Sequence, residues 1–286
     1  MRVVAMTVGF AFVACFGMAS GALGDPIPPG AGQQTVNLGG TALTVYTYRP
    51  SQCAEPKLLL VFHGLNRHAA EYRDHARWLG DTACMIVAAP EFDRKRFPTW
   101  SYQRGGIVHH RRVLPPNEWT VQYVPALIQW AQATERRPID VFMIGHSGGG
   151  QFLSRVAAFV PTTAKRIVVA NPGTHVFPDM AAAPFGFGGV YPRGAEEANL
   201  RRYLATPVTI FLGEEDTSDE NRNDSDDAKQ QGETRLQRGR NAFAAAQALA
   251  RQRGWTFNWR LIELPGVGHN ARKMFSTQEA VEALRP

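Results

Sequence analysis

The stretch Ile139-Asp140-Val141-Phe142-Met143-Ile144-Gly145-His146-Ser147-Gly148-Gly149 decides the fold. Its apolar first half is typical of a buried strand, and residues 151–160 after it have the pattern of a helix. A Gly-x-Ser-x-Gly motif between a strand and a helix is typical of a sharp turn that exposes a nucleophilic serine. Glycines fit at positions 145 and 149 because side chains two residues from the serine would collide in such a turn. We therefore predict that Ser147 is a nucleophile.

A glycine-rich phosphate-binding loop is the alternative interpretation of this stretch. Such a loop requires a lysine followed by serine or threonine after its glycines. Here Gln151 and Phe152 follow Gly150, so the sequence favours the nucleophile.

A serine hydroxyl is a weak nucleophile, which needs a base within hydrogen-bond reach and a carboxylate to orient that base. Two further apolar runs, 207–212 and 259–264, are each followed by a polar turn. The first turn contains Asp216 and the second contains His269. Because ligand sites form past the carboxyl ends of strands in open parallel sheets, we predict that Ser147, Asp216 and His269 form a catalytic triad.

The choice of base is firmer than the choice of acid. His269 is the only one of the eight histidines that follows the acidic turn. Asp216 has close rivals in the same turn, Glu214, Glu215 and Asp219, and a charged turn after a strand is often simply solvated.

A fourth segment, residues 58–62, is an apolar run that leads into His63-Gly64. In hydrolases with this turn, one backbone N–H from such a loop and one from the residue after the nucleophile face the developing oxyanion. The candidates are Leu65 and Gly148, and glycine at position 64 would let the backbone approach a substrate closely.

With these segments placed, the chain resembles the α/β-hydrolase family. Within it, the chain is similar to exported bacterial esterases akin to the polyhydroxybutyrate depolymerase and feruloyl or acetyl-xylan esterase group. The matching stretches are LLLVFHGLNRHAAEYR (58–73), IVAAPEF (86–92), VFMIGHSGGGQFLSR (141–155), VTIFLGEEDT (208–217) and LPGVGHN (264–270). The resemblance implies the chain order serine, acid, histidine and one α/β-hydrolase domain over residues 25–286.

The predicted fold class is α/β, with a doubly wound, mainly parallel sheet of about eight strands and helices on both faces. Alternating strand and helix patterns predict the same arrangement. The expected elements are a hairpin over 35–48, strands near 57–63, 84–89, 139–145, 165–170, 207–212 and 259–264, and helices near 69–79, 119–135, 148–160, 234–253 and 276–284.

The predicted activity is that of a serine carboxylesterase-type hydrolase, which cleaves a small-molecule ester through an acyl-enzyme. A serine peptidase or amidase would use the same residues, and a non-catalytic binding protein on the same fold is a further alternative. Whether polymeric esters are substrates stays open. No cofactor and no metal are expected, because the acidic run over 216–227 fits no metal-binding loop.

The N-terminus has the pattern of a secretory signal peptide. Arg2 precedes an apolar run over residues 3–18, and small residues follow it up to Gly24. We predict cleavage after Gly24 and export to the periplasm or the medium, with no stable membrane insertion of the mature chain. A retained N-terminal anchor is the alternative.

Two cysteines, Cys53 and Cys84, remain after residues 1–24 are removed. An even count in an exported protein predicts one disulfide. The α/β-hydrolase resemblance implies that the strands following these two cysteines lie side by side.

The net charge of +6 falls to +5 without residues 1–24, because Arg2 is the one charged residue there. Basic clusters such as Arg94-Lys95-Arg96 indicate a solvated face or attraction to an anionic surface or substrate. No nucleic-acid-binding motif is present, and no oligomeric state is indicated. Aromatic residues in the loops after residues 90 and 170, among them Phe92, Tyr102 and Phe187, either line an acyl or aryl pocket or pack those loops.

Overall fold

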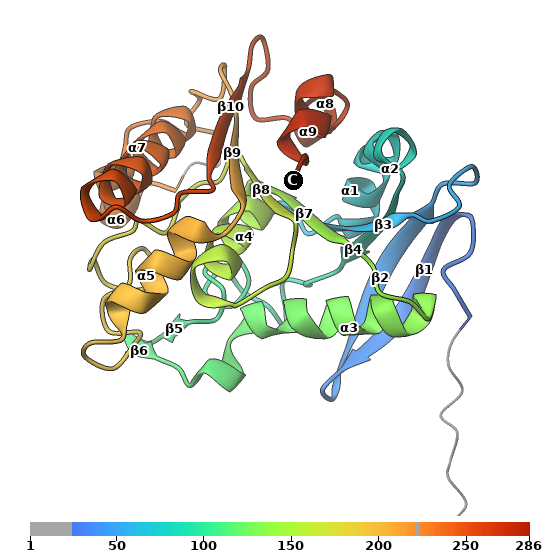
Figure 1. The fold of residues 1–286 in the computed structure, drawn as a ribbon, viewed down its shortest axis with the longest axis horizontal. Coiled ribbons are helices and arrows are strands. Elements are labelled where there is room, and N and C mark those ends of the chain that lie inside the picture. Colours follow the sequence, from blue (N-terminus) through green and yellow to red (C-terminus); the bar gives the residue numbers. More distant parts are fainter. Residues whose placement is uncertain (1–24, 221–222) are drawn as a thin grey trace, which may run out of the picture.

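The computed structural model describes residues 25–220 and 223–286, so the predicted signal peptide over 1–24 lies outside the described residues. An eight-stranded sheet in the order β1-β2-β4-β3-β7-β8-β9-β10 crosses the molecule (Figure 1). Strands β1 and β2 are antiparallel to their neighbours, and the others run parallel. The strands span Gly30–Leu38 (β1), Thr41–Arg49 (β2), Lys57–Phe62 (β3), Met85–Pro90 (β4), Val141–His146 (β7), Arg166–Ala170 (β8), Val208–Gly213 (β9) and Arg260–Leu264 (β10). The predicted sheet is confirmed.

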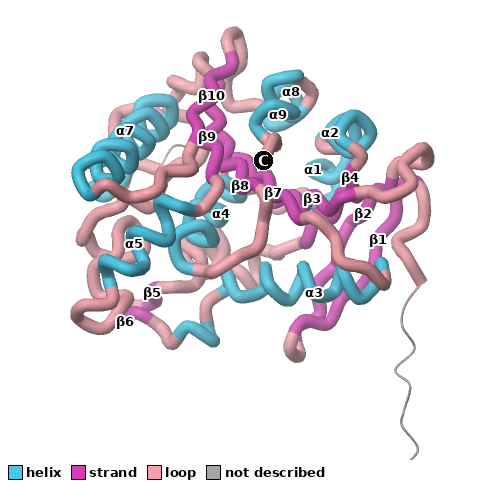
Figure 2. The backbone as a smooth tube through the Cα atoms, in the orientation of Figure 1, coloured by secondary structure: helices cyan, strands magenta, loops and turns pink. Residues whose placement is uncertain are grey.

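Helices cover both faces of this sheet (Figures 1 and 2). One face packs against α1 (Ala69–His75), α2 (Arg77–Ala83), α8 (Ala271–Phe275) and α9 (Gln278–Ala283), and the other packs against α3 (Tyr123–Glu135), α4 (Gly148–Phe159), α5 (Glu196–Ala205) and α7 (Arg235–Arg253). The remaining elements are α6 (Asp226–Gln231), two 3₁₀ turns (Pro116–Glu118 and Thr120–Gln122) and the short hairpin β5–β6 (Val108–His109 and Arg112–Val113). In the described part of the chain, no helix is both long and apolar enough to cross a bilayer.

The core has two halves because side chains alternate across each strand. In β3, Leu58, Leu60 and Phe62 belong to the half that faces α3 and α4. The intervening Leu59 and Val61 belong to the half that faces α1 and α2. All five are fully buried, as expected for a strand covered on both faces.

The sheet reverses its winding between β3 and β7, which are neighbours in parallel. Strand β3 leads into α1 on one face, and β7 leads into α4 on the other. The loops after these two strands therefore diverge and leave a crevice at their carboxyl ends. Ligands bind at this kind of switch point in open α/β sheets.

The predicted disulfide between Cys53 and Cys84 is present, with Cα atoms 5.7 Å apart. It lies at the amino ends of β3 and β4, which pair in parallel from Lys57 and Met85 onward. The bridge therefore joins these two strands near their amino ends, which lie at the opposite end of the strands from the crevice.

Several of the observed helices differ from the predictions. The helix predicted over 69–79 is two helices, α1 and α2, which meet at Ala76. The helix predicted from residue 119 begins at Tyr123, because the residues before it form 3₁₀ turns. Helix α5 was not predicted, and it follows the glycine- and proline-rich segment after β8.

Candidate active site

Ser147 lies in the turn between β7 and α4, with φ 56° and ψ −114°. This left-handed backbone is uncommon for a non-glycine residue. Its N–H donates to Ala170 O of β8 at 3.0 Å, which fixes the turn to the neighbouring strand. The side chain is partly exposed although the elements around it are buried. The local fold therefore presents a serine hydroxyl at the crevice.

The flanking glycines are required by close backbone contacts. A Cβ at Gly145 would lie 2.4 Å from Gly149 O, and a Cβ at Gly149 would lie 2.1 Å from Phe62 O. Real Cβ atoms do not approach backbone so closely. The glycines expected from the motif thus let α4 start directly against the end of β3.

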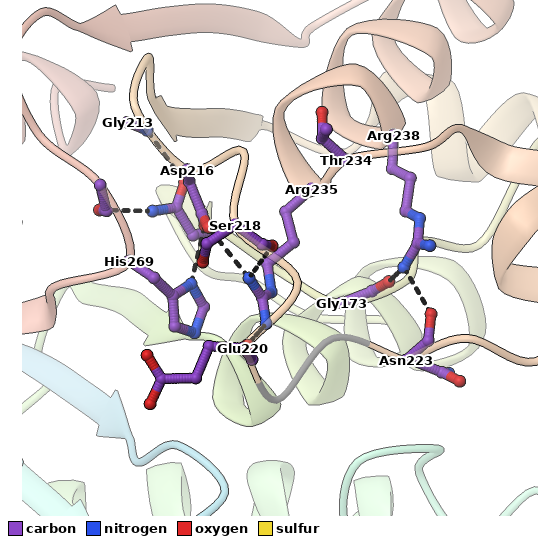
Figure 3. Close-up of polar contacts among 12 residues, drawn as sticks. Gly173, Gly213, Asp216, Ser218, Glu220, Asn223, Thr234, Arg235, Arg238 and His269 are labelled. Atoms are coloured by element: carbon purple, nitrogen blue, oxygen red, sulfur yellow. Dashed lines mark hydrogen bonds and ion pairs between the residues drawn. The ribbon is translucent and has the colours of Figure 1, made fainter.

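Asp216 and His269 are joined by a hydrogen bond of 2.7 Å between Asp216 Oδ2 and His269 Nδ1 (Figure 3). Their turns are adjacent because β9 and β10 are parallel neighbours that pair Gly213 with Leu264. Asp216 is fully buried. Its rivals Glu214, Glu215 and Asp219 are all exposed. The structure therefore places Asp216, and none of these rivals, against the histidine.

Asn171 links the two turns, a contact that the sequence did not reveal. Its side chain accepts from Gly213 N at 2.9 Å and donates to Gly268 O at 3.2 Å. It is fully buried at the end of β8. Asn171 therefore holds the acid turn and the histidine turn at a fixed spacing.

Arg235, at the start of α7, is a second residue that sequence reasoning missed. Figure 3 shows Asp216 between His269 on one side and Arg235 on the other. Arg235 Nη1 donates to Asp216 Oδ1 at 3.0 Å, and both side chains are almost completely buried. The same guanidinium donates to the carbonyl oxygens of Ser218 and Glu220. Both carboxylate oxygens of Asp216 therefore have partners, as a buried charge requires.

Ser147 and His269 line one cavity, of about 430 Å³. Among the described residues no hydrogen bond joins their side chains. In substrate-free sites such bonds are often long and tighten when substrate binds. The ring centroids of His146, next to Ser147, and His269 are 4.5 Å apart, and the two rings are tilted by 42°. Burial holds the pKa of His146 well below its usual range, and the nearby basic side chains His269 and Arg235 lower it further.

The two candidate oxyanion donors lie close together. The position that a Cβ would take at Gly148 is 3.4 Å from Leu65 N, across the crevice between β3 and β7. Neither the Leu65 N–H nor the Gly148 N–H donates to an acceptor within the described chain. Gly148 is also the first residue of α4, whose N-terminal end carries a partial positive charge. Both N–H groups are thus without an acceptor in the described chain and belong to residues beside Ser147.

The loop that carries Leu65 is fixed by a buried, neutral histidine. Phe92 N donates to His63 Nε2 at 3.0 Å, so the opposite nitrogen carries the proton and lies 3.1 Å from Gly64 O. Burial lowers the pKa of His63 to about 3. Tyr102 donates from its hydroxyl to His63 O at 2.8 Å.

The aromatic residues of the long loops pack the protein interior. Phe92, Tyr102 and Phe187 are fully buried. Phe92 and Tyr102 stack at 5.0 Å between ring centroids. None of the three lines the cavities beside Ser147. Of the two alternatives left by the sequence, loop packing is the one observed.

The chain is similar to solved structures of hydrolases. No family model matches the chain, and no curated protein matches it. Among solved structures it is similar to LpqC, a poly(3-hydroxybutyrate) depolymerase from Bordetella parapertussis, with 30% identity over 89% of this chain and 90% of that one and a TM-score of 0.82. It is equally similar to poly(aspartic acid) hydrolase-1 from Sphingomonas sp. KT-1, with 30% identity over 90% and 99% of the two chains and a TM-score of 0.81. An S-formylglutathione hydrolase from Agrobacterium tumefaciens shares the fold at 16% identity, over 88% and 91% of the chains, with a TM-score of 0.54.

Proposed function

The chain belongs to the α/β-hydrolase family, and we propose that it is an exported serine hydrolase that cleaves carboxylic ester bonds. The observation that carries this proposal is the 2.7 Å hydrogen bond between Asp216 and His269, because His269 lines the same cavity as Ser147. The depolymerase and the esterases among similar structures support an ester as the substrate bond. The disulfide supports export, because disulfides persist in oxidising compartments.

In the proposed reaction, Ser147 Oγ attacks the ester carbonyl while His269 Nε2 takes the hydroxyl proton. Asp216 accepts from His269 Nδ1–H, so the imidazole is held in the tautomer whose Nε2 is free to act as base. The buried carboxylate also stabilises the imidazolium that forms. Arg235 keeps this carboxylate in place from the opposite side.

The tetrahedral oxyanion is held by the N–H groups of Leu65 and Gly148, which are preorganised at the crevice. His269 then gives its proton to the alcohol oxygen as the ester C–O bond breaks, which leaves an acyl group on Ser147. Water, deprotonated by His269, attacks this acyl-enzyme and releases the acid, with Ser147 Oγ recovering the proton.

The proposal is tested with a fluorophosphonate probe and a nitrophenyl ester on the wild type and on Ser147→Ala. We expect the wild type to be labelled and active, and the variant to be unlabelled with turnover reduced by several orders of magnitude. Circular dichroism and the melting temperature check that the variant is folded. Near-normal turnover by Ser147→Ala would refute the assignment of Ser147 as the nucleophile. An unlabelled, inactive wild type would favour a non-catalytic binding protein.

Amide hydrolysis is the second candidate. The observation that favours it is the 30% identity to a protein named as a hydrolase of poly(aspartic acid), a polymer joined by amide bonds. Matched esters and anilides of one acyl group separate the two activities, since the same Ser147 would attack both.

A further inference from the structure

Ser147 also lines a second, smaller cavity, here called the acyl-side cavity, of about 190 Å³. Its walls are formed by Leu65, Thr99, Gln103, Arg104, Ser147, Gln151, Gly173, Asn223 and Arg235. Leu65 and Ser147 belong to both cavities, so the nucleophile and one proposed oxyanion donor stand at the boundary between them.

The proposed chemistry decides which part of a substrate enters which cavity. His269 lines the larger cavity and is not among the residues of the smaller one. Because His269 must protonate the departing oxygen, the alcohol leaves through the larger cavity. The acyl group therefore occupies the acyl-side cavity.

The walls of the acyl-side cavity are polar. Gln103 and Gln151 are each 7% exposed. The side-chain oxygen of Gln103 is buried without a hydrogen-bond partner, and its amide presents either oxygen or NH₂ to a ligand by rotation. The oxygen of Gln151 accepts from Thr174 Oγ1 at 2.9 Å, which leaves its NH₂ as a donor. A hydrocarbon acyl chain would bury these amides unpaired, at a cost in free energy.

The charge of this cavity is positive. Arg104 is half-buried, and its guanidinium lies over the ring of Phe185 at 5.4 Å. No carboxylate of the described chain forms an ion pair with Arg104, and the lining residues include no Asp or Glu. Arg155, fully buried on the same phenylalanine, donates only to uncharged oxygens. Arg235 also lines this cavity, but its charge is paired with Asp216.

We propose that the acyl-side cavity binds a carboxylate carried by the acyl group, with Arg104 as the residue that determines this specificity. The substrates are then monoesters of short dicarboxylic acids. A guanidinium forms two parallel, charge-assisted hydrogen bonds with a carboxylate, and the glutamine amides supply further donors. This inference rests on the proposed function and names the substrate class for the same site.

The covalent steps are unchanged by this specificity. Ser147 Oγ bonds to the ester carbonyl carbon, the ester C–O bond breaks, and the alcohol leaves with the proton passed through His269. The distal carboxylate stays ionised on Arg104 throughout. Hydrolysis of the acyl-enzyme then releases the dicarboxylate.

The test compares monomethyl succinate with its neutral isostere methyl succinamate, by release of methanol. For the wild type we expect kcat/KM to favour the anionic ester by about 10- to 100-fold, the range for a hydrogen-bonded charge. Arg104→Met should lower this ratio about tenfold or more, and Arg104→Glu should bring it below one. Arg112→Met is the control, because it removes one exposed positive charge from the nearby β5–β6 hairpin, and Arg112 does not line the acyl-side cavity; its ratio should equal that of the wild type.

The outcomes separate this inference from the proposed function. An enzyme that is labelled at Ser147 but favours methyl succinamate overturns the inference alone. So does an enzyme that turns over nitrophenyl butyrate and neither methyl ester, or an Arg104→Met variant that is folded and keeps the wild-type ratio. A wild-type protein that is neither labelled by the fluorophosphonate nor active on any ester would contradict both the proposed function and this inference.

Discussion

At the scale of single residues, Asp216 connects the other parts of the site, because it bonds to both His269 and Arg235. It contacts the histidine and the arginine through different carboxylate oxygens, and no part of it is exposed. A residue with these contacts fixes the ring of His269 and also carries a buried charge. Changes at Asp216 and at its partners should therefore affect catalysis and stability in distinguishable ways.

Asp216→Asn should lower kcat by roughly 10³- to 10⁴-fold, because an amide in this place favours the wrong tautomer of the histidine. Glu214→Gln and Glu215→Gln are matched controls, since each neutralises an exposed carboxylate in the same turn. Steady-state kinetics on a nitrophenyl ester measure the three variants. A larger loss from either glutamate would move the role of the acid to that residue.

Arg235→Met should reduce both activity and stability, because it leaves the buried carboxylate of Asp216 without the guanidinium that pairs with it. Removing one member of a buried ion pair costs about 3–5 kcal/mol. We expect kcat to fall at least about tenfold and KM to change less. Kinetics and urea unfolding provide the measurement.

Arg240→Met is the control for Arg235, because it removes an arginine from the same helix. Arg240 pairs with Glu263 at 2.6 Å, but its side chain is 49% exposed. An exposed pair of this kind contributes at most about 1 kcal/mol. Equal losses from the two variants would contradict a specific role for Arg235.

The sequence predicted the proximity of Asp216 and His269 because both follow apolar runs that end in polar turns. It did not predict Arg235 or Asn171. Arg235 reaches Asp216 from 19 residues away, and Asn171 bridges turns 42 and 97 residues distant. Contacts of this kind depend on how α7 and β8 pack. A single arginine or asparagine produces no recurring pattern in the sequence from which such a contact could be predicted.

At the scale of elements, long apolar runs were easy to predict and short polar elements were not. All six parallel strands lie where continuous apolar residues predicted them. Helices α6 and α8 have six and five residues, too few for a periodic pattern to emerge. Helix α5 is longer, but Glu196, Glu197 and two arginines make it predominantly polar.

The disulfide joins two elements, and its loss should lower stability without lowering activity. The bridged residues are 31 positions apart, so the cross-link contributes about 3–4 kcal/mol by restricting the unfolded chain. Cys53→Ser with Cys84→Ser should lower the melting temperature by about 10 °C. Because the bridge lies at the strand ends opposite Ser147, kcat at 25 °C should stay near the wild-type value. An unchanged melting temperature would contradict this prediction.

At the scale of the whole molecule, buried neutral histidines make stability depend on pH. Burial lowers the pKa of both His63 and His175 to about 3, whereas the unfolded chain has the ordinary value near 6.5. Between about pH 3 and pH 6.5 the unfolded chain therefore binds more protons. The free energy of unfolding is highest above this range and falls as the pH decreases through it.

Urea unfolding at pH 5.0, 5.5 and 6.0 measures this dependence. Each of the two histidines contributes up to about 1.4 kcal/mol per pH unit. His175→Gln should reduce the slope by nearly that amount, whatever it does to the stability at pH 8. His175 suits the test because its Nε2 has no hydrogen-bond partner among the described residues. An unchanged slope would show that His175 is not neutral in the folded protein.

The position of β10 at one edge of the sheet has a consequence for how inactivation proceeds. Strand β10 pairs with β9, and the turn after it carries His269. Peripheral segments open locally at a lower free energy than central ones. Fraying of this margin would displace His269, the proposed general base, while β3 and β7, beside Ser147, stay intact. At low denaturant concentrations, catalytic turnover should therefore decrease before the circular dichroism signal changes. The protein would lose activity before it unfolds globally.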